Sequence, residues 1–102
     1  KASLSEFKQF CDNNTVHGFM FEVNQQEALK EPIWFGCRFT QIKIHEGSNR
    51  VVFYNDHAFL DIASIVYIVI GDIVEDYYRK MTVVCEDYAH EGLKTYELMM
   101  TF

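Results

Sequence analysis

Carboxylates are the side chains of this sequence best suited to chemistry, and six of them lie in one short segment. Residues 72–91 contain six acids and two bases, so this segment carries −4 of the formal net charge of −6. Such a cluster, with tyrosines among it, suits acid–base catalysis, metal binding or recognition of a basic partner. The side chains concerned are Asp72, Glu75, Asp76, Tyr77, Tyr78, Glu86, Asp87, Tyr88 and Glu91.

A paired-carboxylate active site does not fit the spacing of these acids. Glu75–Asp76 and Glu86–Asp87 flank a predicted strand, one doublet at each end. Two carboxyls that share acid–base work lie roughly 5 to 9.5 Å apart. The ends of an eleven-residue strand are more than about 30 Å apart, at about 3.3 Å per residue. No loop here matches a known calcium-binding spacing. We therefore expect no catalytic residue among these acids.

Metal ligands and nucleophiles are also absent as sequence patterns. The four histidines form no H-x-H or H-x-x-x-H spacing, and the three cysteines form no C-x-x-C pair. Each cysteine shares a predicted apolar face with core residues, where thiols are inert. We expect no metal, no cofactor and three reduced thiols. The residues are His17, His45, His57, His90, Cys11, Cys37 and Cys85.

The acidic balance restricts the classes of partner. Binding a nucleic-acid backbone needs Lys and Arg to displace counterions, and an anionic membrane surface attracts the same residues. The longest apolar run, Ile65–Ile70, is far shorter than the roughly 20 residues that span a bilayer. An odd, sparse set of cysteines fits a reducing compartment. We expect a cytoplasmic protein that binds neither nucleic acid nor membrane directly.

The first third of the chain predicts one helix and one strand. Ser3 and Glu6 form a capping box, which predicts an amphipathic helix over residues 4–12. Residues 16–23 alternate apolar and polar side chains, as a half-buried strand does. The polar residues 24–32 predict a single helical turn before a proline.

The middle of the chain predicts a long β segment and a hairpin. Residues 33–46 are β-rich, but their apolar positions change parity at residues 40–41, which predicts a bulge or strong bend. Residues 46–49 predict a hairpin turn and residues 50–55 the returning strand. Residues 56–64 fit a helical turn or a short strand.

The last third predicts three strands. Val66–Ile70 has no polar face, which favours a place in the middle of a sheet covered on both sides. Gly71–Asp72 predicts a turn of the chain. The strand Tyr77–Asp87 follows, and a turn at residues 89–92 leads to the last strand, Leu93–Phe102.

These elements predict an α+β fold in a single domain, residues 1–102. A short N-terminal helix packs on a bent, mainly antiparallel sheet of about six strands, or on a partly closed barrel. The residues expected to be buried are Phe19, Phe21, Phe39, Val66, Ile68, Ile70, Val83 and Leu98.

The tyrosines make protein binding the favoured function. Adjacent strand residues face opposite ways, so at least one of Tyr77 and Tyr78 is expected to be exposed among carboxylates. Exposed aromatics anchor interfaces and acids steer a basic partner. We predict a non-enzymatic acidic protein-binding module that engages a basic protein through its 72–91 face, as an inhibitor if that partner handles nucleic acid.

Three alternatives stay open from the sequence. The carboxylates bound an apolar strand, and charges in that position commonly keep a strand from aggregating. The chain could instead be a structural subunit that forms homo-oligomers through an exposed edge strand. It could also be a small-ligand-binding barrel, or a small enzyme with its site in a cleft.

Overall fold

The structure is a computed structural model that describes the backbone of residues 1–25, 33–74 and 78–102, and the side chains of residues 1–21, 37–73 and 78–102. This part of the chain forms one helix and eight strands in two antiparallel sheets, so the α+β prediction is confirmed. The strands make two separate sheets rather than a closed barrel. The elements are α1 (Leu4–Asn13), β1 (Gly18–Gln25), β2 (Ile33–Phe39), β3 (Gln41–His45), a 3-10 turn (Glu46–Ser48), β4 (Arg50–Tyr54), β5 (Phe59–Ile62), β6 (Ile65–Val74), β7 (Tyr78–Asp87) and β8 (Gly92–Thr101).

Helix α1 begins with the capping box that the sequence predicts. The Ser3 hydroxyl accepts a hydrogen bond from the Glu6 amide at 3.2 Å, and the Glu6 carboxylate accepts one from the Ser3 amide at 3.2 Å. These two bonds satisfy amides that have no partner inside the helix. Leu4 and Phe7 then turn toward the core and are buried. A helix this short is stable only when such a face is docked.

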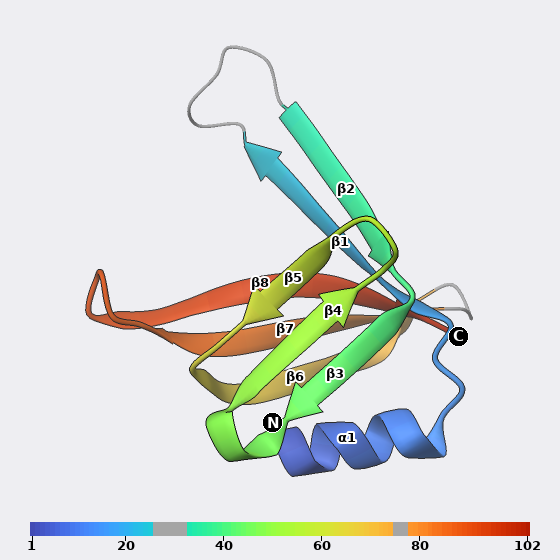
Figure 1. Ribbon diagram of the computed structural model, residues 1–102, viewed down its shortest axis with the longest axis horizontal. Coiled ribbons are helices and arrows are strands. Elements are labelled where there is room, and N and C mark those ends of the chain that lie inside the picture. The colour runs from blue at the N-terminus through green and yellow to red at the C-terminus, as the bar shows by residue number, and fades with distance from the viewer. Residues whose placement is uncertain (26–32, 75–77) are drawn as a thin grey trace.

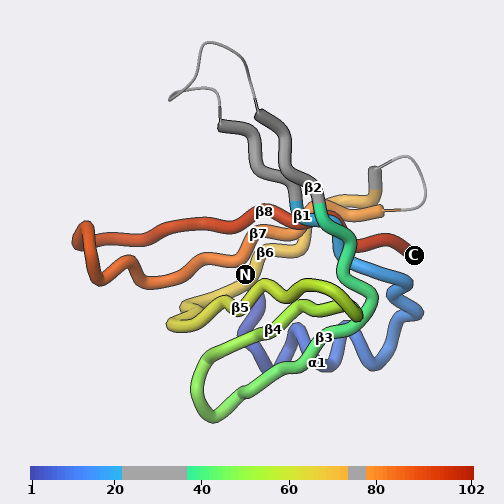
Figure 2. Tube along the Cα trace, turned by 45° about the horizontal axis from the view of Figure 1, so that its top comes forward, coloured from blue at the N-terminus to red at the C-terminus, as the bar shows by residue number. Residues whose placement is uncertain are grey.

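The two sheets and the helix enclose one core. The five-stranded sheet has the order β2-β1-β8-β7-β6, and the three-stranded sheet β3-β4-β5 lies across it, with α1 along one side (Figure 1). The turned view separates the two sheets and shows the strands of the smaller one near α1 (Figure 2). Helix α1 and all eight strands contribute to the core, whose fully buried side chains are Phe7, Phe53, Ile62, Ile68, Met81, Met100, Val51, Val83 and Cys85.

The parity change at residues 40–41 marks the passage from one sheet to the other. Strand β2 ends at Phe39 and β3 begins at Gln41, so the chain bends at Thr40 as the sequence predicts. Phe39 is buried, and Ile42 and Ile44 pack partly buried against the same core. Since the two sheets face each other, side chains of opposite parity reach one core.

Strand β6 contradicts the prediction that Val66–Ile70 lies in the middle of a sheet. It is an edge strand paired only with β7 among the named strands, and Val66 and Val69 are 48% and 36% exposed. The prediction of burial is wrong for Val66, whereas Ile68 is fully buried. The apolar residues on the outer face of β6 are therefore exposed to solvent, and no second layer of described residues covers them.

The predicted turn at Gly71–Asp72 is also wrong. Strand β6 continues to Val74, and the pairing with β7 shifts register between Ile70 and Ile73. An extra residue in one strand produces such a bulge, and glycine is common there. Gly71 therefore lies inside strand β6 rather than at a turn of the chain.

The other predictions from the sequence agree more closely with the structure. The 3-10 turn at Glu46–Ser48 and Asn49, with φ of 51°, make the predicted hairpin turn. Residues 56–64 contain strand β5, which decides between the two alternatives for that segment. Of the residues expected to be buried, Phe21 and Ile70 pack only partly buried against the core. The helical turn predicted at residues 24–32 lies almost wholly outside the described residues.

Within the described ranges, no helix is long and apolar enough to cross a membrane.

Candidate functional site

The end of the β7–β8 hairpin, Glu86–Leu93, projects beyond the neighbouring strands (Figure 1) and is called the β7–β8 tip. The hydrogen-bonded ladder pairs Tyr78 with Thr101 at one end and Asp87 with Gly92 at the other. The amide of Glu86 donates to the carbonyl of Ser64 at 2.9 Å, which fixes the base of the tip to the β5–β6 turn. The other hydrogen bonds described at the tip join residues within it.

Asp87 holds the turn of the tip together. Its carboxylate accepts a hydrogen bond from the Ala89 amide at 3.2 Å and lies 3.2 Å from Nδ1 of His90. Its carbonyl accepts a hydrogen bond from the His90 amide at 3.4 Å. Aspartate favours turns because its side chain can bond to the backbone two residues on. This carboxylate is therefore a structural member of the turn.

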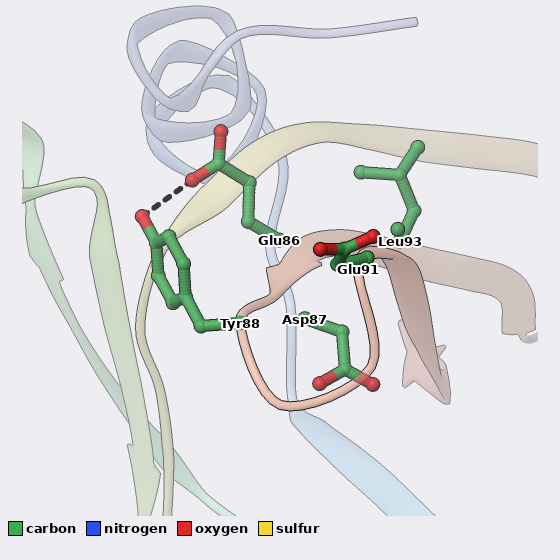
Figure 3. A pocket seen from close by; sticks show the side chains of 6 residues that line it. Glu86, Asp87, Tyr88, Glu91 and Leu93 are labelled. Atoms are coloured by element: carbon green, nitrogen blue, oxygen red, sulfur yellow. Dashed lines mark hydrogen bonds between the residues drawn. The ribbon is translucent and has the colours of Figure 1, made fainter.

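Tyr88 and Glu86 form the exposed pair of the tip. Tyr88 is 79% exposed, and its hydroxyl donates a hydrogen bond to Oε2 of Glu86 at 2.5 Å. Figure 3 shows the tyrosine hydroxyl and the Glu86 carboxylate pointing toward each other, with the Asp87 carboxylate pointing away from both. This bond holds the ring beside the strand end and leaves one oxygen of Glu86 outside that pair.

An open pocket of about 370 Å³ lies at the tip (Figure 3). Leu93, which is 59% exposed, and the ring of Tyr88 supply apolar surface, while Glu86, Asp87 and Glu91 supply carboxylates. Apolar walls beside carboxylates suit a side chain with an aliphatic stem and a cationic head, such as Lys or Arg.

A second hollow, of about 320 Å³, shares Glu86, Asp87 and Tyr88 with the first. Its far wall includes Asp61 and Lys94. Arg50 donates two hydrogen bonds to Asp61, one from Nε to Oδ1 at 2.6 Å and one from Nη2 to Oδ2. The hydrogen bond from Arg50 lowers the pKa of the Asp61 carboxyl, which is therefore charged but already paired. The second hollow is consequently less available to a cation than the first.

The residues predicted to form one acidic face lie in two separate regions. Glu86, Asp87, Tyr88 and Glu91 meet at the tip. Tyr78 begins β7, eight positions away from Glu86, which is roughly 26 Å along a strand. Asp72 lies exposed in β6 near that far end, and Glu75, Asp76 and Tyr77 fall outside the described residues.

Leu93 is the member of the tip that sequence reasoning missed. It starts the last predicted strand, and an apolar residue there gives no sign that it faces solvent. Its place directly after the turn predicted at residues 89–92 is the signal that the sequence offers, and the positive φ angles of Glu91 and Gly92, 46° and 154°, agree with that turn. A residue so close to a tight turn lies beyond the cover of the core.

The cysteines offer little nucleophilic chemistry. Burial, followed by the nearby charge of Asp12, raises the pKa of Cys11 to about 11. Burial also raises the pKa of Cys85, which is fully buried, although Lys94 acts in the opposite direction. Because the thiolate is the reactive form, both thiols are poor nucleophiles near neutral pH. All three cysteines are free thiols.

In the described part of the chain, no group of three or more His, Cys, Asp or Glu residues is placed to hold a metal ion. The chain matches no protein-family model, and neither the curated proteins nor the solved structures include a significant match to it.

Proposed function

We propose that this protein is a non-enzymatic protein-binding module, and that its β7–β8 tip engages a basic surface of another protein. The observation that carries the proposal is the position of Tyr88, a large aromatic ring 79% exposed among carboxylates at the end of a projecting hairpin. Exposed tyrosines are frequent anchors of protein interfaces, because they bury a large area at a small cost in side-chain entropy.

The residues of the tip take different roles in this proposal. Tyr88 and Leu93 supply the apolar contact area, and Glu86 and Glu91 supply charge that attracts a basic partner. Asp87 keeps the turn in shape through its bonds to Ala89 and His90. The hydrogen bond from Tyr88 to Glu86 presents ring and carboxylate as one unit, so less freedom is lost on binding.

A partner that handles nucleic acid would be inhibited by this contact. Its Lys and Arg side chains bind phosphates, and the tip carboxylates would occupy the same cations. In that case an oligonucleotide and this protein should compete for the partner, and both contacts should weaken with added salt. A partner bound equally well in the presence of excess oligonucleotide would rule out the inhibitory role and leave the binding role standing.

Quantitative affinity capture from extract, run in parallel with four forms of the chain, tests the proposal. The forms are the parent, Tyr88→Ala, Glu86→Gln with Glu91→Gln, and the control Asp72→Asn. A true partner is retained by the parent and by Asp72→Asn but is depleted by both tip variants. The proposal fails if no protein shows this pattern, or if the tip variants retain every protein that the parent retains.

Kinetics with the captured partner separate the two parts of the tip. Tyr88→Ala removes an anchor and should raise the dissociation rate roughly tenfold or more. Tyr88→Phe keeps the ring and loses only the bond to Glu86, so it should stay much closer to the parent. The two Glu→Gln changes should mainly slow association and reduce its dependence on salt. Equal effects of Tyr88→Phe and Tyr88→Ala would show that the hydroxyl rather than the ring carries the contact.

A further inference from the structure

The outer edge of β6 already accepts a strand residue from elsewhere in the chain. Ala2 pairs with Ile68 as an antiparallel bridge: the Ala2 amide donates to the Ile68 carbonyl at 2.6 Å, and the Ile68 amide donates to the Ala2 carbonyl at 2.8 Å. The ammonium group of Lys1 lies 4.5 Å from the centre of the Tyr67 ring. The backbone of Ile68 therefore stands in a geometry that supports strand pairing on the side away from β7.

The same edge extends beyond Ala2. In an antiparallel strand the backbone groups of alternate residues point to the same side, so those of Ile70 face the outer edge as those of Ile68 do. Tyr67 to Ile70 pair without interruption with Val84 to Met81 of β7, and the register shifts lie outside this stretch. Residues 67–70 thus form a short, regular edge with two outward-facing positions, of which Ala2 occupies one.

The chemistry of β6 fits an uncharged partner strand. Its ten residues include a single charged side chain, Asp72, whereas the whole chain carries a formal net charge of −6. Val66 and Val69 are 48% and 36% exposed on this strand. Like charges repel two copies of an acidic chain over most surfaces, but two β6 strands can approach with little such repulsion.

We propose that the β6 edge pairs with the β6 edge of a second copy of this chain when Ala2 withdraws, and that residues 1–3 guard the edge against this pairing. A two-fold axis at Val69 brings Ile68 of each chain opposite Ile70 of the other. Both residues face outward, so each such pair exchanges two hydrogen bonds. The contact joins two five-stranded sheets into one continuous sheet.

This register places compatible side chains opposite each other. Val69 lies opposite its own copy at a non-hydrogen-bonded position, where Cα atoms are about 4.5 Å apart. Asp72 lies three positions from Val69, so the two Asp72 residues of the dimer lie on opposite sides of the axis. No like-charge pair therefore forms across the axis.

Ala2 decides whether the contact forms, because it occupies one of the two positions that the second copy needs. With Ala2 in place, Ile70 is the one outward-facing position of residues 67–70 that has no partner among the described hydrogen bonds. A strand contact of one residue is marginal. With Ala2 displaced, both positions are open. The parent chain is therefore expected to be mainly monomeric at micromolar concentration, and loss of the guard should strengthen dimerisation roughly tenfold or more.

Sedimentation equilibrium on the full chain with Ala2→Pro tests the guard. Proline has no amide hydrogen, so it cannot donate to the Ile68 carbonyl, whereas the control Ala2→Ser keeps that amide. Ala2→Pro should move the apparent mass from one chain of 12.0 kDa toward two, and Ala2→Ser should behave as the parent. Adding Val69→Lys places two ammonium groups at the axis and should restore the monomer, while Val69→Thr should not.

A cross-linking experiment keeps the proposal testable if Ala2→Pro fails to fold. With dissolved oxygen as the oxidant, Val69→Cys on the otherwise unchanged chain should form a disulfide-linked dimer whenever the guard opens, because the spacing at the axis suits a disulfide. Val66→Cys is the matched control, since Val66 is more exposed but lies three positions away from the axis. Cross-linking of Val69→Cys no faster than that of Val66→Cys would overturn the proposal. A dimer of Ala2→Pro that survives Val69→Lys would overturn it as well.

Discussion

The β7–β8 hairpin is buried along one part of its length and bare at its tip. Backbone pairing continues from Tyr78 and Thr101 to Asp87 and Gly92. Met81, Val83 and Cys85 are 0% exposed, whereas Leu93, in the same ladder, is 59% exposed. Backbone pairing is common to both regions, so what separates them is the cover supplied by the second sheet and α1.

This contrast indicates which part of the hairpin contributes most to its stability. Removing apolar side chains from water is the main favourable term of folding, and paired backbone groups contribute less because they bonded to water beforehand. The covered part of the hairpin should therefore hold the fold, and the tip should be free to change its side chains. Four sets of substitutions test that division, in order of decreasing effect.

Met81→Ala and Leu93→Ala give the largest contrast. Met81 is fully buried, so its truncation leaves a cavity and should lower the free energy of unfolding by about 2–5 kcal/mol. Leu93 already contacts solvent, so its truncation should cost less than about 0.5 kcal/mol. Urea denaturation of both variants, with an unchanged slope, is the measurement. A cost at Leu93 comparable to that at Met81 would break the comparison between covered hairpin and bare tip.

Side chains at the tip should tolerate substitution, but its backbone conformation should not. Gly92 has a φ of 154°, a conformation that side-chain-bearing residues rarely adopt, so Gly92→Ala should cost about 1–3 kcal/mol although no atom lies within 4 Å of the added carbon. Gly47 has equally open space without that backbone angle, so Gly47→Ala is the matched control and should be neutral or slightly stabilising. Equal unfolding midpoints for the two variants would show that the turn relaxes without strain.

The same division explains what could be predicted from the sequence. The start of α1 depends on Ser3 and Glu6, three residues apart, and the hairpin turn at Glu46–Ser48 is equally local. Alternation in residues 16–23 located the inner face of β1, where Phe19 is buried. Each of these features is determined by neighbours in the chain, so a short window of sequence was enough.

Features that depend on distant partners could not be predicted in the same way. Val66 and Leu93 are apolar residues in apolar strands, and only the arrangement of sheets decides that nothing covers them. Strand β1 pairs with β8, so Gly18 lies opposite Thr101 across almost the whole chain. For the candidate site, composition located Glu86, Asp87, Tyr88 and Glu91. The distance from Tyr78 and Asp72 to the tip required the fold.

The Cys11 thiol should have an effect of intermediate size on stability, and this effect depends on pH. Burial favours the neutral thiol of Cys11 and raises its pKa to about 11 from a usual value of 9.0. Its contribution to stability is therefore present below pH 9.0 and is lost as the pH rises from 9.0 through about 11, because only the unfolded chain ionises easily there.

Urea denaturation at pH 8 and pH 10 measures this loss, with Cys11→Ala as the control. The parent should lose more stability between the two pH values than the variant does. Iodoacetamide should label Cys11 more slowly in the native state than in urea at either pH, because the thiolate is the reactive form. Equal pH dependence of parent and Cys11→Ala would show that Cys11 is not shielded by the fold.

Reversing the charge of the exposed acids at the tip should have the smallest effect on stability. Any loss of partner binding in such a variant therefore reports on function and not on folding. Glu91 and Glu86 are exposed, and the one hydrogen bond described for the Glu86 carboxylate comes from Tyr88. Glu86→Lys with Glu91→Lys should therefore change the free energy of unfolding by no more than about 0.5 kcal/mol per site. Asp87→Lys is the informative control, because it removes the bonds to Ala89 and His90 and should cost more. If the variant with both Glu→Lys changes loses partner binding while its thermal unfolding midpoint is unchanged, the carboxylates act on the partner and not on the fold. If binding also survives, the acids of the tip only keep a bare hairpin in solution, and the proposed binding role of Glu86 and Glu91 falls.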